Sequence, residues 1–217
     1  MKTLVIDMVI KRWPTRNAQR WFRQFLSDAA EDTNVVAVIA IGSAVRDSVD
    51  CDDLDIIAIC RSKAAFDYRA PIEVDLRSFE ATSVEEELES GDDLLGWSVR
   101  FGKVLFERNR YWTKVWERWC DRIRLPSAEV ARARAETTEA QMQEMLKIGD
   151  QRAADELNLS RLTHLARAAL SDAGVYPASR PELPSQLDEI EASLLAQDLR
   201  AALARRSQNQ IAKEPAV

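Results

Sequence analysis

Apolar residues in the first half of the chain fall into short runs separated by polar turns. The runs 35–41 and 54–60 are almost continuous and predict two strands. The run 72–79 predicts a third strand and places Asp75 between two apolar residues. The segment 3–10 is a further candidate strand.

Helical periodicity precedes and follows these strands. Apolar residues recur at helical spacing over 16–30 and predict a helix before the first strand. After the third strand, Ser83 and Glu86 have the spacing of a capping box and predict the start of an interrupted helical stretch over 84–107. A new helix is expected to begin near Gly91.

From residue 109 onward the pattern is helical throughout. We expect helices over 111–124, over 128–170 with a break at Gly149, and from Ser185 to about 206. The order of elements predicts an α+β fold, in which a mixed sheet with flanking helices (1–108) is followed by an all-α helical bundle domain (109–217).

Composition and charge narrow the class of protein. The chain has 217 residues, of which 46% are hydrophobic and 30% charged, which suits one large or two small domains. Its net charge of −6 argues against a free-standing nucleic-acid binder. Three scattered cysteines indicate reduced thiols. Without an apolar run of membrane-spanning length or a signal-peptide pattern, a cytoplasmic protein with no membrane association is expected.

Paired carboxylates give the first chemical signal. Asp53 and Asp55 flank Leu54 at the start of the second strand, so their side chains point to the same face. Two adjacent carboxylates repel each other unless a cation lies between them. Asp75 on the next strand can join them. Carboxylates together with substrate phosphates are typical ligands of Mg²⁺.

The pattern of an apolar strand ending in Gly42-Ser43, followed by Asp53-Leu54-Asp55 and a later Asp75, resembles the nucleotidyltransferase superfamily, which includes DNA polymerase β-like and minimal nucleotidyltransferases. The resemblance covers about residues 16–106. It implies that Asp53, Asp55 and Asp75 are catalytic and hold Mg²⁺ or Mn²⁺. It also implies that Gly42 and Ser43 bind the phosphates of the nucleotide.

Two basic residues are further candidates for nucleotide binding. Arg46 follows Ser43 by three residues and either neutralises phosphate charge or pairs with loop aspartates such as Asp47. Lys103 follows the catalytic layer, in a region that packs beside the nucleotide in similar proteins, and the alternative is a solvated helix face.

The function implied is metal-dependent transfer of a nucleoside monophosphate, by default AMP, from ATP or another NTP to an acceptor hydroxyl, with release of pyrophosphate. The acceptor is a small hydroxylated molecule or a protein, and we expect it to enter between the two domains. Acidic residues of the helical domain can attract a polycation: Glu136, Glu139 and Glu144. Two alternatives stay open, an AMPylating antitoxin acting on a protein partner and a non-catalytic interaction module. A homodimer is also open.

The helical half contains three features of interest. Trp112, Trp116 and Trp119 form one helical stripe that predicts a buried face, with a base-stacking wall as the alternative. His164, the only histidine, is expected to pack between helices. Arg180 lies in a proline-rich segment that is either a rigid connector or a phosphate-binding loop.

Overall fold

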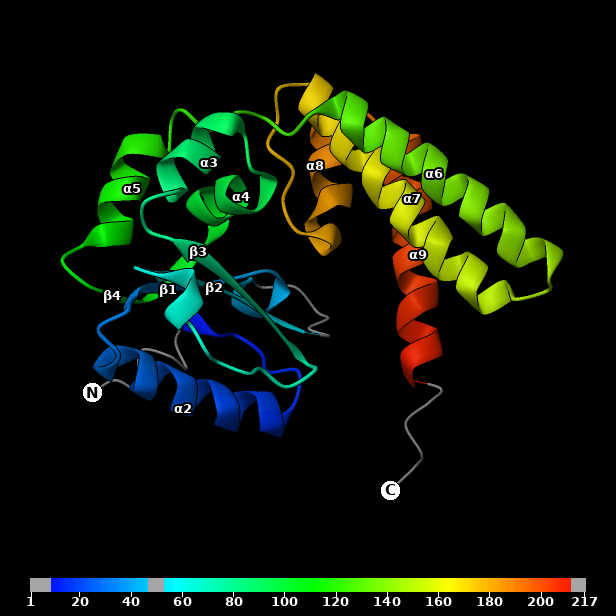
Figure 1. The fold of residues 1–217 in the computed structure, drawn as a ribbon. Coiled ribbons are helices and arrows are strands. Elements are labelled where there is room, and N and C mark those ends of the chain that lie inside the picture. Colours follow the sequence, from blue (N-terminus) through cyan, green and yellow to red (C-terminus); the bar gives the residue numbers. More distant parts are fainter. Residues whose placement is uncertain (1–8, 47–52, 212–217) are drawn as a thin grey trace. The chain divides into compact units, whose positions relative to one another are not determined.

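A computed structural model of the chain describes residues 9–46 and 53–211. Within these residues the strands form a four-stranded sheet of order β3-β2-β1-β4 (Figure 1). The strands are β1 (Val35–Ile41), β2 (Leu54–Cys60), β3 (Val74–Glu80) and β4 (Lys103–Glu107). β1 is antiparallel to β2 and β4, whereas β2 and β3 are parallel, so the sheet is mixed.

The two central strands are buried because helices cover both faces of the sheet. Every residue of β1 is buried, and β2 is buried except at Asp55. This explains why both strands are nearly continuous apolar runs. On one face, α2 (Arg16–Glu31) packs Phe22 and Phe25 into a core that includes Leu54 and Ile56. Thr15 caps α2 by accepting a hydrogen bond from the Ala18 amide.

The opposite face of the sheet is covered by α3 (Val84–Ser90), α4 (Asp93–Phe101) and α5 (Tyr111–Trp119) (Figure 1). The apolar residues of these helices form a second core with Ile57 and Ile59 of β2. Asp55 lies on the same face as Ile57 and Ile59, since side chains alternate along a strand. The second core therefore adjoins the acidic residues.

Several predicted elements need correction. Residues 103–107 form β4 rather than the end of a helix, because α4 ends at Phe101, Gly102 caps it, and the following residues pair with β1. β3 begins at Val74 rather than 72, since Ile72 is 98% exposed. The capping box predicted at Ser83 is absent, because the Ser83 hydroxyl donates to the Glu80 carbonyl instead.

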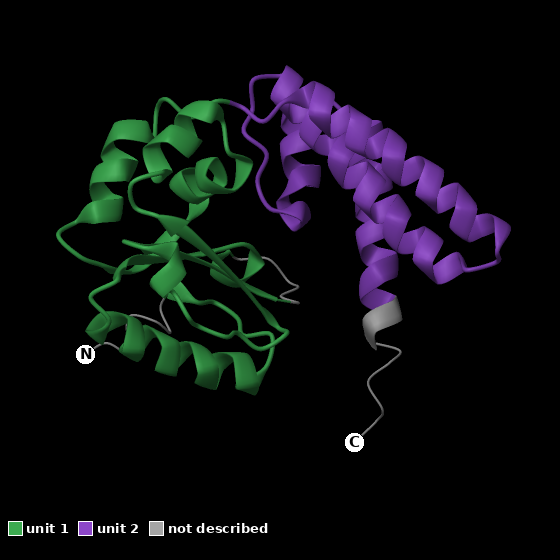
Figure 2. Cartoon of the chain, viewed as in Figure 1, with its two compact units in different colours: residues 1–124 green, residues 125–217 purple. Residues whose placement is uncertain are grey.

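The chain divides into two compact units, residues 1–124 and 125–217 (Figure 2). This division falls later than the boundary that the sequence predicts at 108/109. The physical reason is α5, whose Trp112 and Val115 are buried in the core of the first unit. A chain cut after Arg108 would lose these side chains and expose the core beneath them.

The second unit is helical. It contains α6 (Ala128–Lys147), α7 (Gln151–Asp172), α8 (Leu183–Glu189) and α9 (Ser193–Ile211), with the short helix η3 (Arg180–Glu182) before α8. The predicted break at Gly149 is present. The predicted single helix from Ser185 is two helices, which separate at Glu191, where φ is +61°. Leucines of α7, α8 and α9 form the core of this unit.

The tryptophan stripe of α5 is only partly buried. Trp112 is 1% exposed and Trp119 is half-buried, but Trp116 is 48% exposed. Val115 takes the core position instead, because it lies three residues after Trp112 on the same helix face. The prediction that Trp116 is buried with the other two tryptophans is therefore wrong.

The predicted fold class is confirmed: the protein is α+β, with a mixed sheet, flanking helices and a C-terminal helical region. Most of the candidate strand 3–10 lies outside the described residues, and so does the acidic loop 47–52. In residues 9–46 and 53–211, no helix combines the length and apolar character that crossing a membrane requires.

Candidate active site

The predicted acidic residues meet at one end of the sheet. Asp55, the second residue of β2, pairs in register with Asp75 of the parallel strand β3 and with Ile41, the last residue of β1. Asp53 immediately precedes β2 and is exposed. Because side chains in register on neighbouring strands point to the same face, Asp55 and Asp75 lie side by side.

The surroundings of Asp55 favour the protonated form of its carboxyl group. Its pKa is raised from 3.8 to about 7, first by burial and then by the neighbouring charges of Asp53 and Asp75. The charge of Arg77 opposes them and lowers the pKa. The arrangement therefore concentrates negative charge, which is unfavourable unless a cation offsets it.

Gly42 fits closely against this carboxyl group. Its backbone angles, φ 74° and ψ −161°, lie in a region that is essentially restricted to glycine. A Cβ atom at this position would lie 2.0 Å from Oδ2 of Asp55. The sequence assigns Gly42 to close approach of a phosphate. In the structure, its missing side chain also leaves the space that the Asp55 carboxyl group occupies.

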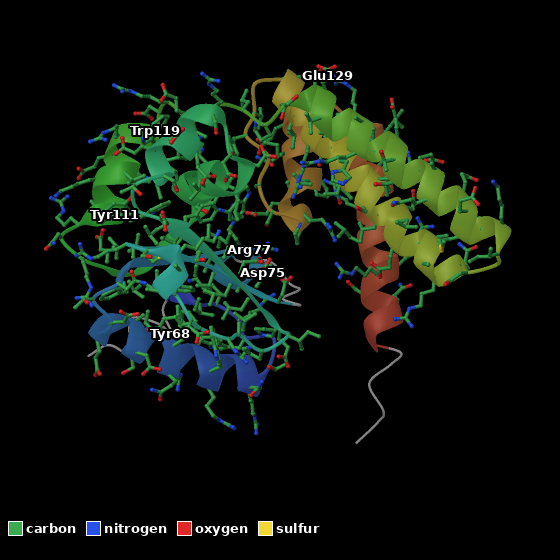
Figure 3. All side chains as sticks on the ribbon, in the orientation of Figure 1. Tyr68, Asp75, Arg77, Tyr111, Trp119 and Glu129 are labelled. Atoms are coloured by element: carbon green, nitrogen blue, oxygen red, sulfur yellow. The ribbon has the colours of Figure 1, made fainter. Side chains whose placement is uncertain are left out.

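Arg77 is the residue that the sequence analysis missed. It lies two residues after Asp75 on the same face of β3, and Figure 3 shows the two side chains next to each other. Its Nε donates to one carboxylate oxygen of Asp75 at 2.7 Å, and its Nη2 donates to the other at 3.1 Å. The period of two along a strand was the available signal, since it places residues 75 and 77 on one face.

The remaining candidates lie at the same end of the sheet. Ser43 begins the short helix η1 (Ser43–Val45), directly after β1. Arg46 is the residue that follows η1, and its guanidinium lies 4.8 Å from the ring centre of Phe101. Lys103 is exposed at the start of β4 and pairs in register with Ala40 of β1. Gly42 contacts Asp55 directly, whereas Arg46 lies against α4.

The carboxylate oxygens are suitable ligands for a hard divalent cation, but they do not form a complete set of metal ligands. Among the residues that the structure describes, no three His, Cys, Asp or Glu side chains converge closely enough to hold a metal ion. Arg77 donates a hydrogen bond to each carboxylate oxygen of Asp75. Carboxylate oxygens are nevertheless the donors that Mg²⁺ and Mn²⁺ prefer, and such an ion would offset the charges of Asp53 and Asp75, which add to the effect of burial on the pKa of Asp55.

The fold is thus a mixed α+β sheet with flanking helices, and an acidic cluster lies at one end of that sheet. Searches with protein-family models and of curated proteins give no match to the chain. Among solved structures, it is similar to a nucleotidyltransferase-like protein from Exiguobacterium sibiricum, with 21% identity and a TM-score of 0.37, over 85% of this chain and 71% of that one.

The contact between Gly42 and Asp55 gives a direct prediction. We expect Gly42→Ala to lower the free energy of unfolding by about 1–3 kcal/mol because of backbone strain alone. The added methyl group would also displace the Asp55 carboxyl group. Gly91→Ala is the control, since Gly91 also has a positive φ but has open space where a Cβ would lie. Chemical denaturation measures the free energy of unfolding of both variants. Equal losses for Gly42→Ala and Gly91→Ala would contradict the close contact between Gly42 and the Asp55 carboxyl group.

Proposed function

We propose that the protein transfers a nucleoside monophosphate, by default AMP, from an NTP to an acceptor hydroxyl and releases pyrophosphate. The observation that supports this most strongly is the position of Asp55, which is half-buried beside Asp75 and against Gly42. A half-buried carboxyl group at the end of a sheet, with its pKa raised to about 7, is typical of a functional site.

Asp53 and Asp55 would hold Mg²⁺ or Mn²⁺, and Asp75 would share it. The ion supplies neutralisation of the triphosphate charge and activation of the attacking oxygen. Asp55 must be ionised to act as a ligand, so its high pKa favours ion binding above pH 7 over binding at pH 6.

The other steps belong to the residues of this chain. A carboxylate oxygen of Asp75 would accept the proton of the acceptor hydroxyl. The acceptor oxygen then bonds to the α-phosphorus, and the bond from that phosphorus to the oxygen bridging the β-phosphate breaks. Backbone N–H groups after Gly42 and the Ser43 hydroxyl would donate to phosphate oxygens. Arg46 and Lys103 would add positive charge at this end of the sheet.

Titration calorimetry with ATP tests the binding step. Wild-type protein should bind ATP in the presence of Mg²⁺ and should lose this binding when EDTA is added. Asp53→Asn should weaken binding of the Mg²⁺ complex at least tenfold, because it removes a ligand. Glu89→Gln, which neutralises an exposed acid on α3, is the matched control and should bind normally. ATP binding that is insensitive to EDTA and to Asp53→Asn would contradict the proposal.

The ion pair of Arg77 with Asp75 leads to a separate prediction. Arg77 competes with a metal ion for the Asp75 oxygens, so Arg77→Gln should strengthen Mn²⁺ binding a few-fold. The effect is modest because both side chains are largely exposed. Arg110→Gln, which breaks an exposed pair with Glu117 on α5, is the control. Weaker Mn²⁺ binding by the Arg77 variant in calorimetry would contradict this competition.

A further inference from the structure

Basic side chains follow the exposed face of α2. Residues 11–23 contain five basic residues and no acidic one. Lys11 and Arg12 precede the helix, Arg16, Arg20 and Arg23 lie on it, and all five are exposed. Residues three or four apart are neighbours on one face of a helix, with about 5–6 Å between their Cβ atoms. The three arginines of α2 therefore form one row, which we call the basic stripe.

The stability of α2 does not explain where these charges lie. The dipole of a helix favours acidic residues in its first turn and basic residues in its last turn. In α2 this order is reversed, because the first turn has no acidic residue and the last turn has no basic one. Arg16 begins the helix, whereas Asp28 and Glu31 lie near its end. A bound anion would offset the unfavourable position of the arginines.

The residues around the basic stripe indicate the kind of anion. The apolar face of α2, which includes Phe22 and Phe25, is buried in the core, so it cannot insert into a membrane as the apolar face of an interfacial helix does. The exposed residues of α2 are all polar or charged, among them Asn17, Gln24 and Ser27. Protein interfaces have an apolar centre, whereas interfaces with nucleic acids are polar and positively charged. The exposed face of α2 therefore fits a nucleic acid better than an acidic protein.

We propose that the basic stripe is a docking surface for the phosphate backbone of a nucleic acid. Guanidinium groups match phosphate oxygens in geometry and form charge-assisted hydrogen bonds with them. Arg12 and Arg23 have contacts of their own, so Arg16 and Arg20 are the residues that we assign to the phosphates. A row of cations suits a polymer whose charges also lie in a row. The net charge of −6 does not prevent this docking, because a bound polymer experiences mainly the local field.

The basic stripe is separate from the candidate active site. α2 packs on the face of the sheet that carries Leu54 and Ile56, whereas Asp55 lies on the opposite face, which α3, α4 and α5 cover (Figure 1). The docking surface therefore goes beyond the proposed transfer reaction and uses none of its acidic residues. Asp55→Asn should leave nucleic-acid binding unchanged.

Fluorescence anisotropy with a short, labelled single-stranded RNA tests the docking surface. EDTA is present throughout, so that no divalent ion can hold the RNA at the acidic site. The wild-type protein should bind, and the logarithm of its affinity should fall linearly with the logarithm of the salt concentration. Arg16→Gln combined with Arg20→Gln should weaken binding about tenfold or more at low salt. It should also reduce the steepness of the salt dependence by about 0.7 for each arginine, because each phosphate contact releases counterions.

Two further variants separate the charge of the basic stripe from the total charge and from the fold. Arg110→Gln combined with Arg118→Gln removes the same charge at α5, where these exposed arginines pair with Glu117 and Glu85, and should bind RNA like the wild type. Lysines at positions 16 and 20 keep the charge, so Arg16→Lys combined with Arg20→Lys should retain the steepness of the salt dependence.

Competing anions decide between nucleic acid and other partners. Equal affinities for RNA and DNA of the same sequence would show that the phosphates alone are recognised, and a preference for one of them would add a contact to the sugar; either result supports the surface. Competition by polyglutamate as strong as that by RNA would point to an acidic protein, and tighter binding to phosphatidylglycerol vesicles would point to a membrane; both would contradict the proposal. So would RNA binding that is absent, or that the glutamine variant of Arg16 and Arg20 leaves unchanged.

Discussion

Asp55→Asn should abolish nucleotidyl transfer and yet raise the melting temperature at neutral pH. The substitution removes a proposed metal ligand, and its loss should reduce the transfer rate by a factor of about 10³ or more, on the order of other losses of an essential catalytic group. It also removes the repulsion from Asp53 and Asp75 and the cost of burying a charge. An amide has nearly the same shape as the carboxyl group, so Gly42 can still pack against it.

The raised pKa of Asp55 determines how the change in melting temperature depends on pH. The folded chain holds a proton on Asp55 up to about pH 7, whereas the unfolded chain releases it near pH 4. The stability that this proton contributes is complete below about pH 4 and is lost as the pH rises through 7. The gain in melting temperature for Asp55→Asn should therefore be clear at pH 8 and nearly absent at pH 4.

Thermal unfolding at the two pH values, without divalent ions, measures the effect. Glu89→Gln provides the comparison for loss of an exposed acid. If Asp55→Asn lowered the melting temperature at pH 8, the carboxylate would be a stabilising group, and the description of the site as mutually repelling carboxylates would be wrong.

Trp112→Ala should cause the largest loss of stability, about 3–5 kcal/mol in the free energy of unfolding. Trp112 is 1% exposed and joins α5 to the core that includes Ile57, Ile59 and Val99. Truncation leaves a cavity between the helix and the sheet. The side chain lies in the first unit, so unfolding of that unit is the relevant transition.

Trp116→Ala is the matched control, since it removes the same side chain from the same helix at a position that is 48% exposed. Its cost should be about 1 kcal/mol. Denaturant unfolding followed by circular dichroism compares the two variants. Equal losses would contradict the assignment of Val115, rather than Trp116, to the core face of α5.

The central strands could be predicted from the sequence because burial on both faces leaves an apolar run that nothing else explains. β4 could not be predicted in the same way. Its residues, Lys103–Glu107, follow a helix directly, and their strand conformation depends on pairing with β1, about sixty residues earlier. The break of the last helix at Glu191 was likewise missed, since neither glycine nor proline marks it.

The sequence predicted which residues belong to the candidate site, but it did not predict the contacts between them. Alternation along β2 places Asp53 and Asp55 on one face, and the structure adds the register that brings Asp75 beside Asp55. The contact of Gly42 with the Asp55 carboxyl group depends on the turn at the end of β1, which the sequence does not specify. The ion pair of Arg77 with Asp75 depends on side-chain rotamers.

The most direct test of the proposed function compares ATP labelled at the α-phosphate with ATP labelled at the γ-phosphate, each incubated with the protein, Mg²⁺ and a cell extract. Label from the α-phosphate should appear on an acceptor, small molecule or protein, and pyrophosphate should be released. Asp55→Asn and EDTA should each prevent this transfer. Transfer of the γ-label instead, or α-label transfer that Asp55→Asn leaves intact, would contradict nucleotidyl transfer at this site.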